Sequence, residues 1–199
     1  MIVKMARRFG KRLLFQPRLG TLGTGTRVDL PREINNPKLI HIGARTYIRH
    51  SSIINAISEY ADVKYNPIIS FGDDMYVGRH CQFHATDSIK IGSGTVLSDF
   101  VYMSDNSHGF IPSRGQIMEQ SLSSKGPINI GNNCFIGVGS TILANISLGD
   151  WCIVGARSLV TTSFPAYCMV AGTPARIIKK ISPDKNSWVS ILDRNRNEY

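Results

Sequence analysis

Six aliphatic residues recur at intervals of six positions in the C-terminal half of the chain. They are Ile130, Ile136, Ile142, Leu148, Val154 and Val160, and glycine follows four of them directly. A period of six matches neither the α-helical period of about 3.6 residues nor the alternation of a β-strand. It is typical of a parallel β-helix built from hexapeptides, in which each step makes one short strand and one turn. The spacing therefore predicts an all-β fold shaped as a triangular prism.

The same step continues towards the N-terminus in groups of three, each of which supplies one turn of the prism with inward-pointing apolar side chains. The groups are Leu22, Val28 and Ile34; Ile42, Ile48 and Ile54; Phe71, Val77 and Phe83; and Ile91, Leu97 and Met103. Every extra segment falls after the third hexapeptide of a group. The insertions are therefore expected to leave the prism at one edge, and in repeat proteins such a face is often the binding face.

A length of 199 residues predicts one domain with small caps. We expect a basic N-terminal segment over residues 1–20, the prism over 21–181 with a loop inserted at about 104–127, and a cap with a tail over 182–199. Ser182, Pro183 and Asp184 have the pattern of a helix N-cap followed by proline. This pattern predicts a short α-helix from about residue 183 to residue 194 that packs on the prism.

The formal net charge of +9 is concentrated at both ends of the chain, and no nucleic-acid motif accompanies it. The N-terminal basic group could contact an anionic membrane surface, or it could be a solvated surface. No apolar run is long enough for a membrane span, and no signal peptide is evident. The four cysteines, Cys81, Cys134, Cys152 and Cys168, form no C-x-x-C motif. We interpret them as packed free thiols, which favours a cytoplasmic setting.

The longest insertion, between Met103 and Ile130, contains the segment Ser-Asp-Asn-Ser-His-Gly-Phe over residues 104–110. Its histidine, His108, lies next to a glycine at the edge of a rigid scaffold. Because the ordinary pKa of histidine lies near neutral, His108 is a candidate general base. Considered alone, a histidine in a surface loop is more often inert.

Three features together resemble the left-handed β-helix acyltransferases: the hexapeptide repeats, the Asp-x-x-His-Gly loop and the closing Val-Ala-Gly-Thr-Pro-Ala-Arg of residues 170–176. The chain is most similar to the sugar and lipopolysaccharide O-acetyltransferase branch, akin to galactoside and maltose acetyltransferases. Residues 130–137 fit the family's Ile-Gly-x-x-x-Trp-Ile-Gly with Phe135 in place of tryptophan, and residues 154–161 fit its Ile-Gly-Ala-x-Ser-Val-Val-Thr. The resemblance extends from about Phe71 to Lys180.

The resemblance implies a left-handed coil, a homotrimer with active sites between subunits, acetyl-CoA as co-substrate and no metal. His108 would take a proton from a sugar hydroxyl, whose oxygen would attack the thioester directly. The backbone N–H of Val138 from a neighbouring subunit would stabilise the oxyanion. The acceptor would be a saccharide, free or lipid-linked, in surface polysaccharide biosynthesis, and nucleic acid would not be a partner.

The resemblance also implies a site for coenzyme A, formed by Phe135, Gly137, Ala156, Thr161, Thr173, Pro174, Arg176 and Lys179. The family often has lysine after the threonine that matches Thr161, whereas this chain has Thr162. For the acceptor we expect Asp105, Asn106, Tyr102 and His84, within a pocket lined by the inserted segments 55–67 and 109–127. Loop capping is an equally good interpretation of Asp105 and Asn106.

Three alternatives stay open. A xenobiotic acetyltransferase has a similar loop histidine and coil. A zinc enzyme like the γ-type carbonic anhydrases would need His80, His84 and His108 to converge on the metal. A non-catalytic scaffold would keep the prism without needing His108. The sequence identifies neither the acceptor sugar nor the hydroxyl that is acetylated.

Overall fold

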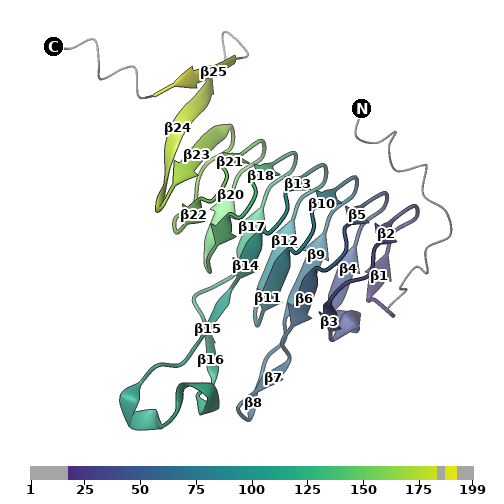
Figure 1. The fold of residues 1–199 in the computed structure, drawn as a ribbon, viewed down its shortest axis with the longest axis vertical. Helices are drawn as coiled ribbons and strands as arrows, with labels where there is room; N and C mark the ends of the chain where they lie inside the picture. The colour runs from purple at the N-terminus through teal and green to yellow at the C-terminus, as the bar shows by residue number, and fades with distance from the viewer. Residues whose placement is uncertain (1–17, 183–186, 192–199) are drawn as a thin grey trace.

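A computed structural model describes residues 18–182 and 187–191. Three parallel sheets form the faces of a prism (Figure 1). Sheet 1 contains β1 (Thr21–Leu22), β4 (Ile40–Ile42), β9 (Ile68–Phe71), β12 (Ser88–Ile91), β17 (Ile128–Ile130) and β20 (Ile146–Leu148). Sheet 2 starts with β2 (Arg27–Val28), β5 (Tyr47–Ile48), β10 (Tyr76–Val77), β13 (Val96–Leu97), β18 (Phe135–Ile136) and β21 (Ile153–Val154). Sheet 3 contains β3 (Glu33–Asn35), β6 (Ile53–Ala56), β11 (Gln82–Ala85), β14 (Tyr102–Ser104), β19 (Thr141–Ile142) and β22 (Leu159–Val160).

The strand registers confirm the predicted groups. Each group places its first member in sheet 1, its second in sheet 2 and its third in sheet 3. In sheet 3, for example, Ile34, Ile54 and Phe83 are aligned, and Met103 follows Phe83. From Val28 onwards these side chains stack along the axis of the prism in one continuous core, in which Ile34 is only partly buried. The inward position predicted for Leu22 is wrong, because this residue lies on β1 at the end of sheet 1 and is 42% exposed. The fold is the left-handed β-helix that the hexapeptide spacing and the family resemblance predicted.

Small side chains fill the corners inside the coil, four residues after an inward aliphatic or aromatic residue. All four cysteines occupy such positions and are buried free thiols. Burial raises the pKa of Cys81 to about 12 and that of Cys152 to about 11. Thr46 uses its hydroxyl in the same kind of corner, donating to the carbonyl of Gly72 at 2.8 Å. The thiols are therefore packing groups, which explains why no C-x-x-C motif accompanies them.

The C-terminal cap differs from the prediction. Strand β23 (Cys168–Gly172) continues sheet 2 by pairing in parallel with β21, and β24 (Ala175–Ser182) and β25 (Ser187–Ser190) then extend the sheet antiparallel. The predicted helix over residues 183–194 is therefore wrong at Ser187–Ser190, which form a strand. The parts of that prediction that fall on residues 183–186 and 192–194 lie outside the described residues. The eight-residue strand β24 offers an open edge, and pairing with that edge outweighs the local N-cap pattern.

Two β-hairpins project from the prism on the same side (Figure 1). The first arm (residues 57–67) contains β7 (Glu59–Tyr60) and β8 (Val63–Lys64). The second arm (residues 105–127) contains β15 (Asn106–His108), the short 3₁₀ turns η2 (Pro112–Arg114) and η3 (Ile117–Glu119), and β16 (Leu122–Ser124). Both arms leave between sheet 3 and sheet 1, and the turn η1 (Pro37–Leu39) lies in the corresponding connection of the first coil. The prediction of a single insertion edge is thus confirmed.

Two tyrosines of the first arm hold the main chain of the second. The Tyr60 hydroxyl donates to the carbonyl of Met118 at 2.7 Å, and the Tyr65 hydroxyl donates to the carbonyl of Leu122 at 2.9 Å. Because the prism itself is rigid, these bonds give the two arms a defined position relative to one another. Among the described residues, no helix is long and apolar enough to cross a membrane.

Candidate active site

A pocket of about 580 Å³ lies where the two arms meet the outer face of sheet 3. Sheet 3 contributes outward-facing side chains that follow the inward aliphatic or aromatic residues, so that Asn35, Asn55 and His84 are aligned on neighbouring strands. The first arm contributes Ile57, Glu59 and Tyr60, and the second contributes residues 106–108 and Leu122. The pocket therefore gathers side chains from both insertions on a rigid floor.

His108, the predicted base, ends strand β15 and lines this pocket. Its ring is half-buried and forms a T-shaped pair with the Tyr60 ring, with centroids 5.2 Å apart and planes at 71°. Its Nδ1 atom is buried without a hydrogen-bond partner among the described residues. Gly109 follows, and a Cβ there would lie 2.9 Å from the Cβ of Gln120, so the strand can approach the returning chain only with glycine at this position.

The predicted acceptor residues fall into two groups. His84 and Tyr102 line the pocket together, with ring centroids 5.6 Å apart. Burial lowers the pKa of His84, which keeps its imidazole largely neutral at pH 7. Asn106 also lines the pocket, but its amide donates to the carbonyl of His84 at 3.1 Å and to Asp105 Oδ1 at 3.0 Å.

Asp105 points away from the pocket and is 0% exposed. Its carboxylate accepts the backbone N–H of Thr86 at 2.8 Å, the backbone N–H of Asp87 at 2.9 Å and the hydroxyl of Thr86 at 3.2 Å. Asp105 therefore caps the turn that joins β11 to β12. Of the two interpretations that the sequence left open for Asp105, loop capping fits its hydrogen bonds.

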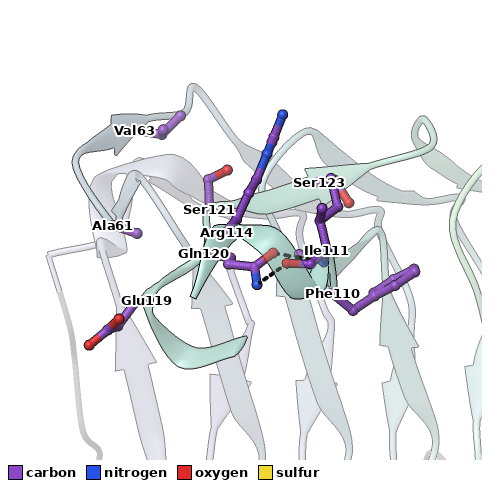
Figure 2. A pocket seen from close by; sticks show the side chains of 10 residues that line it. Ala61, Val63, Phe110, Ile111, Arg114, Glu119, Gln120, Ser121 and Ser123 are labelled. Carbon is purple, nitrogen blue, oxygen red and sulfur yellow. Dashed lines mark hydrogen bonds between the residues drawn. The ribbon is translucent and has the colours of Figure 1, made fainter. Parts of the chain in front are cut away.

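A second hollow of about 500 Å³ is lined by residues of both arms, with Ala61 and Val63 from the first arm and the remainder from the second (Figure 2). Gln120 shapes it by exchanging two hydrogen bonds with the main chain of Ile111, each 3.0 Å long, and by donating to the carbonyl of Gly115. Its rim includes the exposed ring of Phe110 and the charged side chains of Arg114 and Glu119. No residue predicted individually for the site lines this hollow, although all of its lining residues lie in the inserted segments 55–67 and 109–127 that were expected to line the acceptor pocket.

Three of the predicted coenzyme residues and the predicted oxyanion donor, Val138, stack in successive coils at the corner between sheets 2 and 3. Gly137 and Val138 occupy this corner in one coil, Ala156 in the next, and Thr173 follows. The coils are close, because a Cβ on Gly137 would lie 2.6 Å from the nitrogen of Ala156. The N–H groups on either side of Val138 donate to the carbonyls of Val154 and Asp99, whereas the Val138 N–H has no such acceptor among the described residues.

The other predicted coenzyme residues are more dispersed. Phe135 lies on the outer face of sheet 2 and is 43% exposed. Pro174 follows Thr173 in the turn before β24, and Arg176 and Lys179 lie on that strand. Thr161 follows β22 at the far edge of sheet 3, away from this corner. Within one chain the corner formed by Gly137, Val138, Ala156 and Thr173 and the His108 pocket therefore lie at different edges of the prism.

The three histidines of the zinc alternative do not converge. His80 stacks flat on Phe100 at the corner between sheets 2 and 3, with centroids 4.8 Å apart, while His84 and His108 lie in the pocket. In the described part of the chain, no group of three potential ligands could hold a metal ion.

Sequence reasoning did not single out Tyr60 or Asn55 as individual residues. Asn55 lies at an outward position directly after the inward Ile54, in register with His84, so the repeat itself could have indicated it. Tyr60 reaches His108 only because the two arms fold together, and no sequence pattern connects residues so far apart.

The bacterial transferase hexapeptide family (six repeats) matches residues 127–162. Among relatives, WbbJ of Escherichia coli (strain K12), assigned to lipopolysaccharide biosynthesis as an O-acetyl transferase, is 27% identical over 207 aligned residues, covering 94% of this chain and 98% of that protein. The galactoside O-acetyltransferase of Escherichia coli (strain K12) is 29% identical and covers 63% of this chain and 64% of its own length. Rv3034c of Mycobacterium tuberculosis, named as an acetyltransferase, is 26% identical, and the chain spans about half of it, 49%.

Solved structures share the fold. AntD, an N-acyltransferase from Bacillus cereus in complex with dTDP and 3-hydroxybutyryl-CoA, superposes with a TM-score of 0.69 at 17% identity, covering 89% of this chain and 88% of that one. A maltose O-acetyltransferase from Clostridium difficile 630 gives a TM-score of 0.52 at 23% identity, covering 82% and 71%. The repeats, the strand register and these relatives together show that the chain is similar to the hexapeptide-repeat acetyltransferases.

Proposed function

We propose that the protein is an O-acetyltransferase that moves the acetyl group of acetyl-CoA to a sugar hydroxyl, with His108 as the general base. The lining of the His108 pocket carries this proposal. Amide, hydroxyl and aromatic side chains dominate it, and Glu59 is the one residue there, histidines aside, with a formal charge. Such groups suit a polyhydroxylated acceptor, because sugars present both hydrogen-bonding hydroxyls and apolar ring faces.

In the proposed reaction, His108 removes the proton from the acceptor hydroxyl while its oxygen attacks the thioester carbonyl. Nε2 is the nitrogen that takes the proton, since Nδ1 is buried. The tetrahedral intermediate collapses by breaking the C–S bond, and His108 returns its proton to the departing thiolate. A positioned base of this kind contributes roughly 10²- to 10⁴-fold to the rate.

The N–H of Val138, which has no acceptor in the described part of the chain, is our candidate for the oxyanion donor, and loss of one such donor costs about 3 kcal/mol. Because His108 and Val138 lie at different edges of one chain, we propose that they meet between neighbouring subunits of a homotrimer. The exposed corner at Ala156 and Thr173, with Phe135 beside it, would take the pantetheine arm. Arg176 and Lys179 would meet the anionic nucleotide end.

Relatives support the choice of substrates. Structures of the same fold hold acetyl-CoA in a Vibrio cholerae acetyltransferase and dTDP with an acyl-CoA in AntD. WbbJ, which matches nearly the whole chain, is assigned to lipopolysaccharide biosynthesis. We therefore propose a saccharide acceptor of a surface polysaccharide, free or lipid-linked, and a cytoplasmic setting, which the four buried thiols favour. Contact of the N-terminal basic segment with a membrane surface stays a prediction, since residues 1–17 lie outside the described residues.

The test is thiol release from acetyl-CoA in the presence of a panel of methyl glycosides. His108→Ala should reduce transfer by at least 100-fold while acetyl-CoA binding, measured by calorimetry, stays within about twofold. His41→Ala is the matched control, because His41 lies on sheet 1 and does not line the pocket. Near-normal transfer by the His108 variant would refute the assignment of the base. Transfer to small drug molecules instead of sugars would favour the xenobiotic alternative.

A further inference from the structure

Among the residues that the structure describes, no polar group forms a hydrogen bond with the His108 ring. A catalytic histidine commonly has one ring nitrogen held by a carboxylate or carbonyl, which sets the tautomer and the angle of the ring. Here Nδ1 has no partner among the described residues. The nearest carboxylate in sequence, Asp105, is engaged with the turn at Thr86 and Asp87. Some other contact must therefore fix the imidazole.

Tyr60 supplies such a contact. Its ring meets the imidazole edge-on at 5.2 Å and 71°, the geometry that aromatic pairs favour. Tyr60 belongs to the first arm, whereas His108 belongs to the second, so the contact joins two separate insertions. Both side chains are half-buried and line the same pocket.

Hydrogen bonds fix Tyr60 in turn. Its hydroxyl donates to the carbonyl of Met118, far along the second arm, at 2.7 Å. Tyr65, on the same first arm, donates to the carbonyl of Leu122, which is the residue paired with His108 across the β15–β16 ladder. The second arm is therefore held at the turn η3 and at the start of β16, and the Tyr60 ring lies against the imidazole on β15.

We propose that Tyr60 is a positioning residue for His108, and that the first arm thereby takes part in the acetyl transfer proposed above. The ring restricts the imidazole to the orientation in which Nε2 faces the pocket. The hydroxyl of Tyr60 has a separate role, since it anchors the second arm through Met118. The inference rests on the proposed function, because positioning has a kinetic consequence only if His108 is the base.

The two roles of Tyr60 can be separated by substitution. Tyr60→Phe keeps the ring and removes the hydrogen bond to Met118, whereas Tyr60→Leu removes both. Tyr65→Phe is the matched control, because it removes the same kind of hydrogen bond to the second arm without touching His108. Each variant is assayed with acetyl-CoA and the best methyl glycoside of the panel, and kcat and both KM values are measured.

We expect Tyr60→Leu to lower kcat about 10- to 100-fold with little change in the KM for acetyl-CoA, because misplacement of a catalytic group by about 1 Å costs on that order. Tyr60→Phe and Tyr65→Phe should stay within about fivefold of the wild type. On a His108→Ala background, Tyr60→Leu should have no further effect, since residues that act through one another are not additive. An NMR spectrum selective for histidine should show the ring-current shift of His108 in wild type and Tyr60→Phe, but not in Tyr60→Leu.

Four outcomes would overturn the inference. Tyr60→Leu could retain wild-type kcat, Tyr60→Phe could be as slow as Tyr60→Leu, the double variant could be clearly slower than His108→Ala, or the His108 resonance could be indifferent to Tyr60→Leu. If instead His108→Ala is itself active, the proposed function fails first. The histidine spectrum, which needs no turnover, then still decides whether Tyr60 holds the ring.

Discussion

Substitution of Asp105 distinguishes a structural role from the acceptor-binding role that the family resemblance implied. The carboxylate accepts two backbone N–H groups and one hydroxyl of the turn at residues 86–87, and Thr86 is buried. Hydrogen bonds to a charged group contribute about 1.5–3 kcal/mol each. Even at the low end of that range, losing the two backbone bonds in Asp105→Ala should destabilise the protein by about 3 kcal/mol.

For a chain of this size, a loss of 1 kcal/mol lowers Tm by roughly 2–4 °C, so Asp105→Ala should unfold about 6–12 °C below the wild type. The measurement is thermal unfolding by circular dichroism at one fixed protein concentration, because the stability of an oligomer depends on concentration. Asp87→Ala is the matched control, since the side chain of Asp87 is exposed and only its backbone N–H reaches Asp105. That variant should unfold within about 2 °C of the wild type.

Kinetic measurements on the same variant complete the test. If Asp105 only caps the turn, the folded variant at low temperature should keep the wild-type KM for the acceptor. An unchanged Tm together with a raised acceptor KM would refute the capping argument and restore Asp105 as a ligand of the sugar.

Three further predictions concern other parts of the structure. Burial lowers the pKa of His84 below its ordinary 6.5, so near that pH the unfolded chain binds more protons than the folded one, and the free energy of unfolding should fall as pH drops below about 6.5. In urea unfolding between pH 7.5 and 5, His84→Gln should reduce the dependence of the unfolding free energy on pH. An unchanged pH dependence would contradict the argument. Gly109→Ala should displace the chain at Gln120, because the new Cβ would lie 2.9 Å from the Cβ of Gln120. The variant should lower kcat about 10- to 100-fold with little loss of Tm. A wild-type kcat would show that the second arm accommodates the methyl group without moving His108. The four buried thiols should resist iodoacetamide at pH 8 while the protein is folded and react fully in guanidinium, with alkylation measured by mass spectrometry. Burial raises the pKa of Cys81 to about 12, so rapid alkylation of Cys81 in the folded protein would contradict its burial.

The prism could be predicted from the sequence because its repeat is local. Each inward residue, such as Ile136, stacks on its counterpart one coil away, so the pairing register follows from the spacing alone. The same reasoning located both insertions. It failed at Ser187–Ser190, where the pattern at Ser182 and Pro183 indicated a helix but the open edge of β24 recruits a strand.

The pocket was only partly predictable. His108, His84 and Tyr102 could be proposed because a family motif or the repeat register marks them. The contact between Tyr60 and His108 and the hydrogen bond from Tyr60 to Met118 join separate insertions, and the latter spans 58 residues. No periodicity records such contacts, because they depend on how two irregular arms pack together.

Because both arms emerge from one edge, their length is independent of the ladder behind them. Residues added or removed beyond Ile57 or Asp105 would change no strand register, since the coil resumes at Ile68 and Ile128 with the same partners. The arms can therefore change in length and sequence while the prism stays the same, and the proposed acceptor pocket can change without altering the corner at Val138. They must be exchanged as a pair, however, since Tyr60 and Tyr65 of one arm recognise the main chain of the other. A chimera that receives only one foreign arm should fold with an intact prism and a disordered pocket.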